Sequence, residues 1–239
     1  MKIFRIGLPV IVACAAVFSL QAQTADDIIN KHVEAIGGKD VLSKVKSIYF
    51  EGSASVMGAE YPTTTTILAG KGFKTVTSVN GTDIIQCITD ISGWSLNPMI
   101  GQATATPLPP DMVKNRRSSL DIGGELVNFR EKGFTDSLLG REDCYGVSAY
   151  KVKLSQPGAE IVYLFDPNTY YTLKMDAKAN MGGQDITNTT TYSDYKKTDI
   201  GYVVPTTLGV TNSGYDVTIT YTKVEVNKQV DPGIFVMGK

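Results

Sequence analysis

The first periodic stretch of the chain has the apolar spacing of a helix. Apolar residues recur every three to four positions over 25–36, and Thr24 before them is suited to an N-cap. A Gly-Gly pair at 37–38 ends the pattern, and a second short helix is expected over 40–45. Each helix carries one apolar stripe, so both need another layer of structure to cover them.

From residue 47 onward the apolar period changes to two, which is typical of half-buried strands. Asn80-Gly81 predicts a tight hairpin, and a phase jump between Tyr221 and Val224 predicts either a bulge or the end of a register. We therefore expect a mainly β (α+β) domain with one large, strongly curved antiparallel sheet. Eleven or twelve strands are predicted, at residues 47–56, 61–69, 73–79, 82–89, 94–96, 134–139, 147–154, 160–166, 170–176, 185–193, 202–211 and 215–226.

Two of these strands, 82–89 and 160–166, carry apolar side chains on both faces. A sheet with one face in water would alternate between apolar and polar residues throughout its strands. Either helices cover the second face, or the concave side of the sheet encloses an apolar cavity.

Residues 98–133 interrupt the strands with four prolines, a basic tract at 114–117 and an amphipathic, helical stretch at 124–132. The prolines are expected to keep the segment from becoming another strand. The basic tract at 114–117 is either a solvated helix face or a docking site for acidic groups. The segment is either permanent core or a lid whose flexible apolar side chains hold cargo against the concave sheet. The candidate cargo residues are Trp94, Leu96, Met99, Ile100, Leu108, Met112, Leu126 and Phe129.

Residues 1–22 have the layout of a cleavable signal peptide, which directs residues 23–239 to the periplasm. Lys2 and Arg5 precede an apolar stretch over 6–20 that continues past Cys14, so a cut after Ala22 is favoured. The alternative is a lipobox ending at Cys14, which would anchor the protein to a membrane by a lipid on that cysteine.

Charge and cysteine content narrow the function further. Without residues 1–22 the 23 basic residues fall to 21 against 24 acidic ones, so the net charge changes from −1 to −3 and offers no footprint for nucleic acid. Cys87 and Cys144 are then the remaining cysteines, and they form either one disulfide or two buried thiols. His32 is the single histidine, and no nucleotide, metal or cofactor motif is present, so we expect no enzyme and no cofactor.

Several short motifs in fixed order resemble those of one family. They are ADDII through AIGG at 25–38, GVSAYKVKL at 146–154, YLFDPNTYYT at 163–172, YSDYK at 192–196, GYVVP at 201–205, and VEVN at 224–227 followed by Phe235. Their order and spacing resemble the outer-membrane lipoprotein-sorting family, the carrier LolA and its receptor LolB, in the divergent form common among Bacteroidetes.

The resemblance implies a half-open β-barrel of about eleven strands with an N-terminal helix and a central helical lid. It also implies a non-catalytic envelope protein that holds lipoprotein acyl chains or another lipid in the concavity, together with a partner at the outer or inner membrane. The alternative function is a structural or partner-binding envelope module of the same fold, in which the protein's own side chains fill the concavity.

Overall fold

The computed structural model describes residues 23–181, 184–212 and 215–238. The expected signal peptide and Cys14 lie outside the described residues. A single antiparallel sheet of thirteen strands forms most of the chain, in the order β6-β5-β4-β3-β2-β1-β13-β12-β11-β10-β9-β8-β7. The strands are β1 (Ser47–Val56), β2 (Ala59–Leu68), β3 (Gly72–Val79), β4 (Thr82–Thr89), β5 (Gly93–Asn97), β6 (Gln102–Pro107), β7 (Thr135–Cys144), β8 (Val147–Gln156), β9 (Ala159–Phe165), β10 (Thr172–Met181), β11 (Gln184–Lys197), β12 (Val203–Asn212) and β13 (Tyr215–Val226).

Few helices accompany the sheet. The α-helices are α1 (Ala25–Ala35), α2 (Gly38–Leu42) and α3 (Pro110–Asn115), and the 3-10 helices are η1 (Pro98–Ile100), η2 (Arg117–Leu120), η3 (Gly124–Leu126) and η4 (Pro232–Phe235). Thr24 caps α1 as expected: its hydroxyl accepts from the Asp27 N–H, while the Asp27 carboxylate accepts from the Thr24 N–H.

The hairpin and the bulge that the pattern predicts are both present. Asn80 and Gly81 have φ values of 50° and 81°, which suit a tight type I′ turn between β3 and β4. Thr222 is the extra residue of a bulge in β13, opposite the step between Glu51 and Gly52 in β1. A side chain at Gly52 would overlap the carbonyl oxygen of Thr220, so this crowded crossing requires glycine.

Two expectations for the 98–133 segment are wrong. Residues 102–107 form the edge strand β6, which tolerates Pro107 because one side of an edge strand has no partner to receive an N–H. The stretch 124–132 is helical only over η3, because Gly123, Gly124 and Asn128 all have positive φ and interrupt any α-helix.

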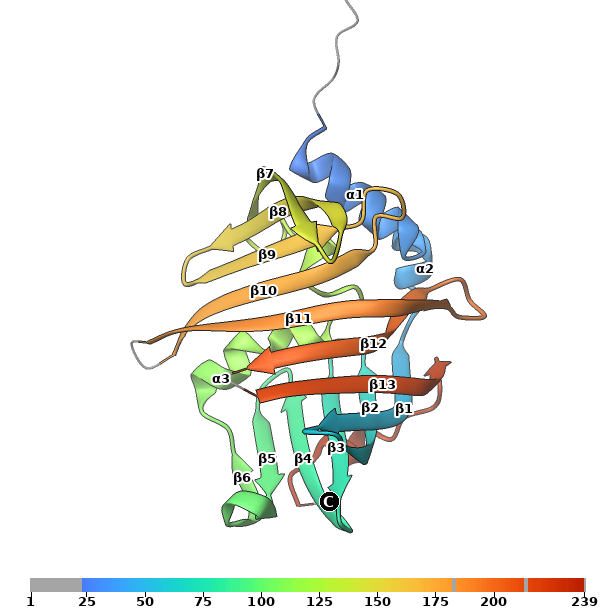
Figure 1. Cartoon of the computed structure of the whole chain (residues 1–239). Helices are drawn as coiled ribbons and strands as arrows, with labels where there is room; N and C mark the ends of the chain where they lie inside the picture. The colour runs from blue at the N-terminus through green and yellow to red at the C-terminus, as the bar shows by residue number, and fades with distance from the viewer. Residues whose placement is uncertain (1–22, 182–183, 213–214, 239) are drawn as a thin grey trace, which may run out of the picture.

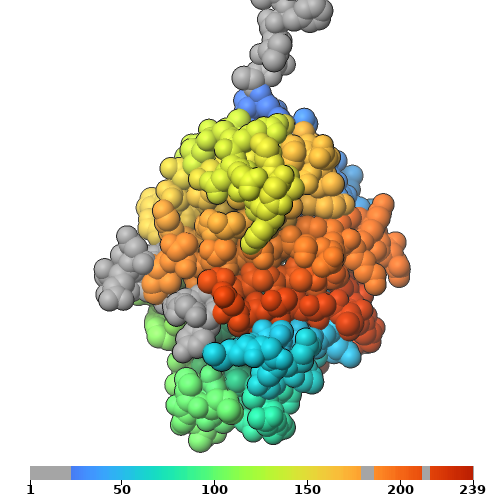
Figure 2. Space-filling model, in the orientation of Figure 1, coloured from blue at the N-terminus to red at the C-terminus, as the bar shows by residue number. Residues whose placement is uncertain are grey.

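The sheet curls around the helices. Inner-face residues of β1 and β12 pack against α1 and α2, and inner-face residues of β8 and β9 pack against α1 and Phe129. We call this side the inner face and the opposite side the outer face. The strands β8–β13 run across Figure 1 and β2–β6 run nearly perpendicular to them. On the side shown in Figure 2, β7–β13 form one continuous surface.

The strand β4 is apolar on both faces because both are covered. Cys87 and Ile88 are neighbours in sequence, point to opposite faces, and are both 0% exposed. Ile88 packs on the inner face against Val113 and Leu120, whereas Cys87 packs on the outer face against Phe235. The second face is thus covered by the segment 230–237 near the C-terminus, which includes η4.

Candidate functional site

The structure does not bring the eight candidate cargo residues together. Trp94 and Leu96 belong to the outer-face cluster, together with Phe235. Leu108 packs on the inner face beside Ile88, and Leu126 and Phe129 are buried among α1, β8 and β9. The remaining three are the half-buried Met112 and the exposed Met99 (59%) and Ile100 (77%). In this arrangement Trp94 and Leu108 lie on opposite faces of the sheet, so the eight residues do not line one site, and a lid over bound cargo stays a prediction.

The inner face is filled largely by the protein's own side chains. Helices α1 and α2 and the segment 108–129 occupy it, and the side chain of Arg116 donates a hydrogen bond to Gln86 there. An inner-face cavity between the segment 121–126 and the strands β9–β12 has a volume of about 220 Å³.

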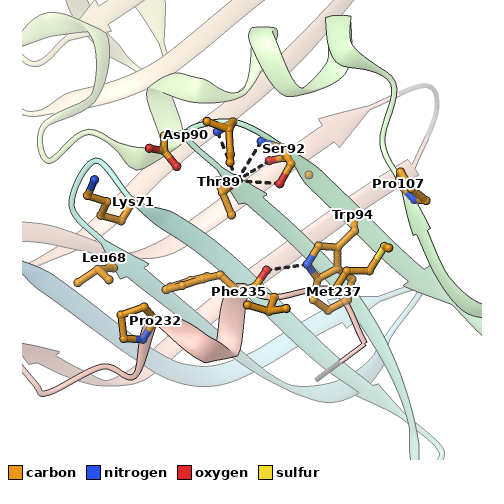
Figure 3. Close-up of a pocket in the computed structure, with 13 residues that line it drawn as sticks. Leu68, Lys71, Thr89, Asp90, Ser92, Trp94, Pro107, Pro232, Phe235 and Met237 are labelled. Atoms are coloured by element: carbon orange, nitrogen blue, oxygen red, sulfur yellow. Dashed lines mark hydrogen bonds between the residues drawn. The ribbon is translucent and has the colours of Figure 1, made fainter.

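A larger pocket of about 680 Å³ lies on the outer face, where β2, β4, β5 and β6 meet the segment 230–237 (Figure 3). Its size is within the usual range of small-molecule sites, roughly 300–1,000 Å³. Most of its lining is apolar. The lining residues are Leu68, Lys71, Thr89, Asp90, Ile91, Ser92, Gly93, Trp94, Pro107, Pro232, Phe235, Val236 and Met237.

Hydrogen bonds hold the segment 230–237 against the sheet. The Lys74 Nζ donates to the carbonyl oxygen of Ile234 at 2.9 Å, and the Trp94 Nε1 donates to the carbonyl oxygen of Phe235 at 2.9 Å. Gly72 has no side chain, and a Cβ there would lie 2.5 Å from the Phe235 ring. The absent side chain at position 72 therefore makes room for the ring that forms one wall of the pocket.

The rim of the pocket leaves apolar groups in contact with water. Ile91 is 84% exposed, and Val236 and Met237 are each about half exposed. The turn that carries Ile91 is held in shape by Thr89, whose hydroxyl accepts from the Ser92 N–H at 2.9 Å (Figure 3). Apolar side chains exposed around an apolar pocket are typical of a surface that contacts a ligand, a membrane or another protein.

The two described cysteines are free thiols. Cys87 lies on β4 and Cys144 at the end of β7, and these strands are on opposite halves of the sheet, in separate clusters. Burial raises the pKa of Cys87 to about 11, so its thiol stays protonated and unreactive at neutral pH. The disulfide considered from the sequence is not formed.

His32 is a buried structural residue on α1. Its Nδ1 lies 2.8 Å from the carbonyl oxygen of Tyr170, and burial lowers its pKa to about 4. The described residues contain no group of three or more His, Cys, Asp or Glu side chains that could hold a metal ion. Among the helices of the described part, none is long and apolar enough to cross a membrane.

Sequence reasoning found Trp94 and missed most of the other pocket residues. The missing wall comes from an apolar run at 234–237, which follows the Pro-Gly pair at 232–233. That run has no strand period and no partner nearby in sequence, so its place on the sheet could not be predicted. Its concentration of apolar side chains was the available signal.

Comparisons with known proteins identify the fold. No family model and no curated protein matches the sequence. A putative outer membrane lipoprotein-sorting protein domain from Vibrio parahaemolyticus matches with a TM-score of 0.57 at 16% identity, over 88% of this chain and 97% of that one. The LolA superfamily protein NE2245 from Nitrosomonas europaea matches with a TM-score of 0.57 at 13% identity, over 90% and 98%.

A third solved structure, a DUF1329 family protein from Desulfovibrio piger, matches with a TM-score of 0.56 at 14% identity, over 89% and 97% of the two chains. At these identities the matches describe architecture, and they extend over nearly the whole length of each chain.

Proposed function

The chain has a LolA-like fold, and we propose that it is an exported, non-catalytic envelope protein that binds the acyl chain of a lipid or lipoprotein. The outer-face pocket of about 680 Å³ beside Trp94 is the observation that carries this proposal. The likeness to a lipoprotein-sorting domain supports it, as does the layout of residues 1–22 as a signal peptide. We place the binding surface in this outer-face pocket rather than in the concavity that the sequence indicated, because the protein's own side chains fill much of the concave face.

The chemistry of the pocket suits an acyl chain. Each methylene group removed from water contributes about 0.8 kcal/mol, so a chain segment of several carbons could bind with useful affinity. The aromatic wall formed by Trp94 and Phe235 is fixed by hydrogen bonds, while Met237 at the rim is unbranched and can adapt to different chain shapes. The exposed rim residues Ile91 and Val236 then gain cover when the pocket is occupied.

Trp94 is the single tryptophan of the chain, so its fluorescence reports on this pocket alone. A fatty acid brominated along its chain is expected to quench Trp94 saturably, with a stoichiometry of one. The unbrominated fatty acid of equal length should compete with the brominated one without quenching. If neither quenching nor co-purified lipid is found, by titration and by mass spectrometry of natively purified protein, the proposal is wrong.

The second candidate function is a partner-binding envelope module. The inner-face cavity of about 220 Å³ favours it, because that volume is below the range of usual ligand sites. In this case the exposed apolar rim would contact a protein, and Trp94 would show no response to any fatty acid. The same titration therefore separates the two functions.

A further inference from the structure

A second, smaller cavity lies on the inner face, opposite the apolar pocket, and is rich in polar groups. Tyr163 from β9, Tyr192 and Tyr195 from β11 and Tyr202 before β12 line it, together with Glu125 and His32. Strand alternation alone would place Tyr192 and Tyr195 on opposite faces. Asp194 between them has a φ of 53°, which interrupts the alternation, and both rings line the cavity.

Some of these polar groups are satisfied within the protein. The Tyr163 hydroxyl donates to one carboxylate oxygen of Glu125 at 3.0 Å, and the Tyr195 hydroxyl donates to the carbonyl oxygen of Thr172 at 2.7 Å. Both hydroxyl protons are thus used within the protein, and the two bonds hold the walls of the cavity in place.

Other polar groups keep unused hydrogen-bonding capacity. Because a carbonyl oxygen only accepts, the His32 Nδ1 must carry the proton that it shares with Tyr170, and Nε2 of the neutral ring is then a bare acceptor. The second carboxylate oxygen of Glu125 has no partner in the described part of the chain, and the Tyr192 hydroxyl donates weakly to the sulfur of Met175, at 3.7 Å. The His32 Nε2 and the second carboxylate oxygen of Glu125 are therefore acceptors that a ligand with N–H donors could use.

The cavity also carries negative charge without a matching cation. Asp121 at its edge is paired with the Lys132 Nζ at 2.8 Å. Within residues 23–181, 184–212 and 215–238, Glu125 has no ion-pair partner, and no lysine or arginine lines the cavity. Leaving a carboxylate in a partly desolvated cavity is unfavourable unless water or a ligand compensates its charge.

These features select one class of ligand. An anion would be repelled by Glu125. A quaternary ammonium ion would supply the charge but no N–H donors for the free acceptors. A protonated primary amine supplies a positive charge and three donors, and charged hydrogen bonds are the strongest that such groups form.

We propose that the inner-face cavity binds a small protonated primary amine through Glu125. The volume of about 220 Å³ limits the bound group to a few heavy atoms, such as methylammonium or the amine end of ethanolamine. This site is independent of the proposed acyl-chain site, because the two lie on opposite faces of the sheet.

Methylammonium titrated into the protein at neutral pH, followed by calorimetry, tests the proposal. Saturable binding of one equivalent is expected, with much weaker binding of tetramethylammonium and potassium. Glu125→Gln should weaken methylammonium binding about ten- to hundredfold, as expected for the loss of a charged hydrogen bond. Glu131→Gln is the matched control, because Glu131 is exposed, makes the same charge change, and does not line the cavity.

Several results would overturn the proposal: no saturable methylammonium binding, unchanged binding in Glu125→Gln, or equal binding of tetramethylammonium or potassium. If Glu125→Gln does not fold, Tyr192→Phe decides, since it retains the charge and should weaken binding severalfold, whereas unchanged binding would contradict the assignment. Free ethanolamine and vesicles with or without phosphatidylethanolamine distinguish a free amine from a lipid headgroup. If the protein binds neither of them, the proposal is wrong. Quenching of Trp94 by a brominated fatty acid reports separately on the outer-face pocket.

Discussion

The indole N–H of Trp94 donates a 2.9 Å hydrogen bond to the carbonyl oxygen of Phe235, which lies 141 residues later in the chain. Both residues are buried, so each polar atom of this bond is satisfied inside the protein. The bond joins β5 to the segment 230–237 and fixes two walls of the outer-face pocket (Figure 3). Stability and the proposed acyl-chain binding are therefore expected to be coupled at this pair.

Gly72→Ala should displace the Phe235 ring, because the new Cβ would lie 2.5 Å from it. We expect a loss of about 1–3 kcal/mol in the free energy of unfolding, as for other overpacked sites, and weaker acyl-chain binding. Denaturant unfolding followed by circular dichroism measures the first effect. In a Phe235→Leu background the same substitution should cost clearly less, and an equal cost would show that the ring is not the cause.

Met237→Asp should lower acyl-chain affinity while leaving stability nearly unchanged. Met237 lines the pocket and is half exposed, so the carboxylate stays hydrated in the empty protein but would be desolvated beside a bound chain. We expect at least about a tenfold weaker affinity in the Trp94 quenching titration. Met57→Asp is the matched control, because Met57 is 95% exposed in the β1–β2 turn, away from the pocket. Equal acyl-chain affinity of the two variants would contradict the placement of Met237 at the rim of the binding pocket.

Protonation of His32 should destabilise the fold in mild acid. Burial lowers its pKa from 6.5 to about 4, so between these values the unfolded chain binds more protons than the folded one. The stabilisation is fully present above pH 6.5 and is lost as the pH falls toward 4, by a total of about 3 kcal/mol.

The His32→Gln variant isolates this effect, since His32 is the single histidine of the chain and glutamine does not titrate. Its free energy of unfolding should depend less on pH across that window than that of the unmodified protein. Parallel pH dependences, measured by denaturant unfolding at several pH values, would show that His32 does not contribute.

Phe129→Ala should destabilise the protein without affecting acyl-chain binding. Phe129 is buried against α1 on the inner face, so truncation leaves a core cavity and should cost about 3–5 kcal/mol. Met112→Ala should cost less, because Met112 is only half buried. A small melting shift with altered Trp94 quenching in Phe129→Ala would instead support a movable lid.

The sequence alone determined the features that depend on neighbouring residues. Thr24 caps α1 by accepting a hydrogen bond from the N–H of Asp27, three residues later. Asn80-Gly81 forms a hairpin because both residues tolerate positive φ. The phase jump in the last strand indicated the bulge at Thr222, since side-chain period and strand register are locally linked. A curved, mainly antiparallel sheet followed from the same periodicity.

Only the tertiary structure decided which face of each strand is covered by helices and which face lines the outer-face pocket. Alternation shows that Trp94 and Leu96 share a face, but it cannot show that helices cover the opposite one. The outer-face pocket depends on the segment 230–237, whose contacts with β3, β4 and β5 span well over a hundred residues. The inner-face cavity likewise forms only where Glu125 contacts β9, a strand that lies about forty residues later in the chain. Both sites are set by packing between distant segments, which no local pattern encodes.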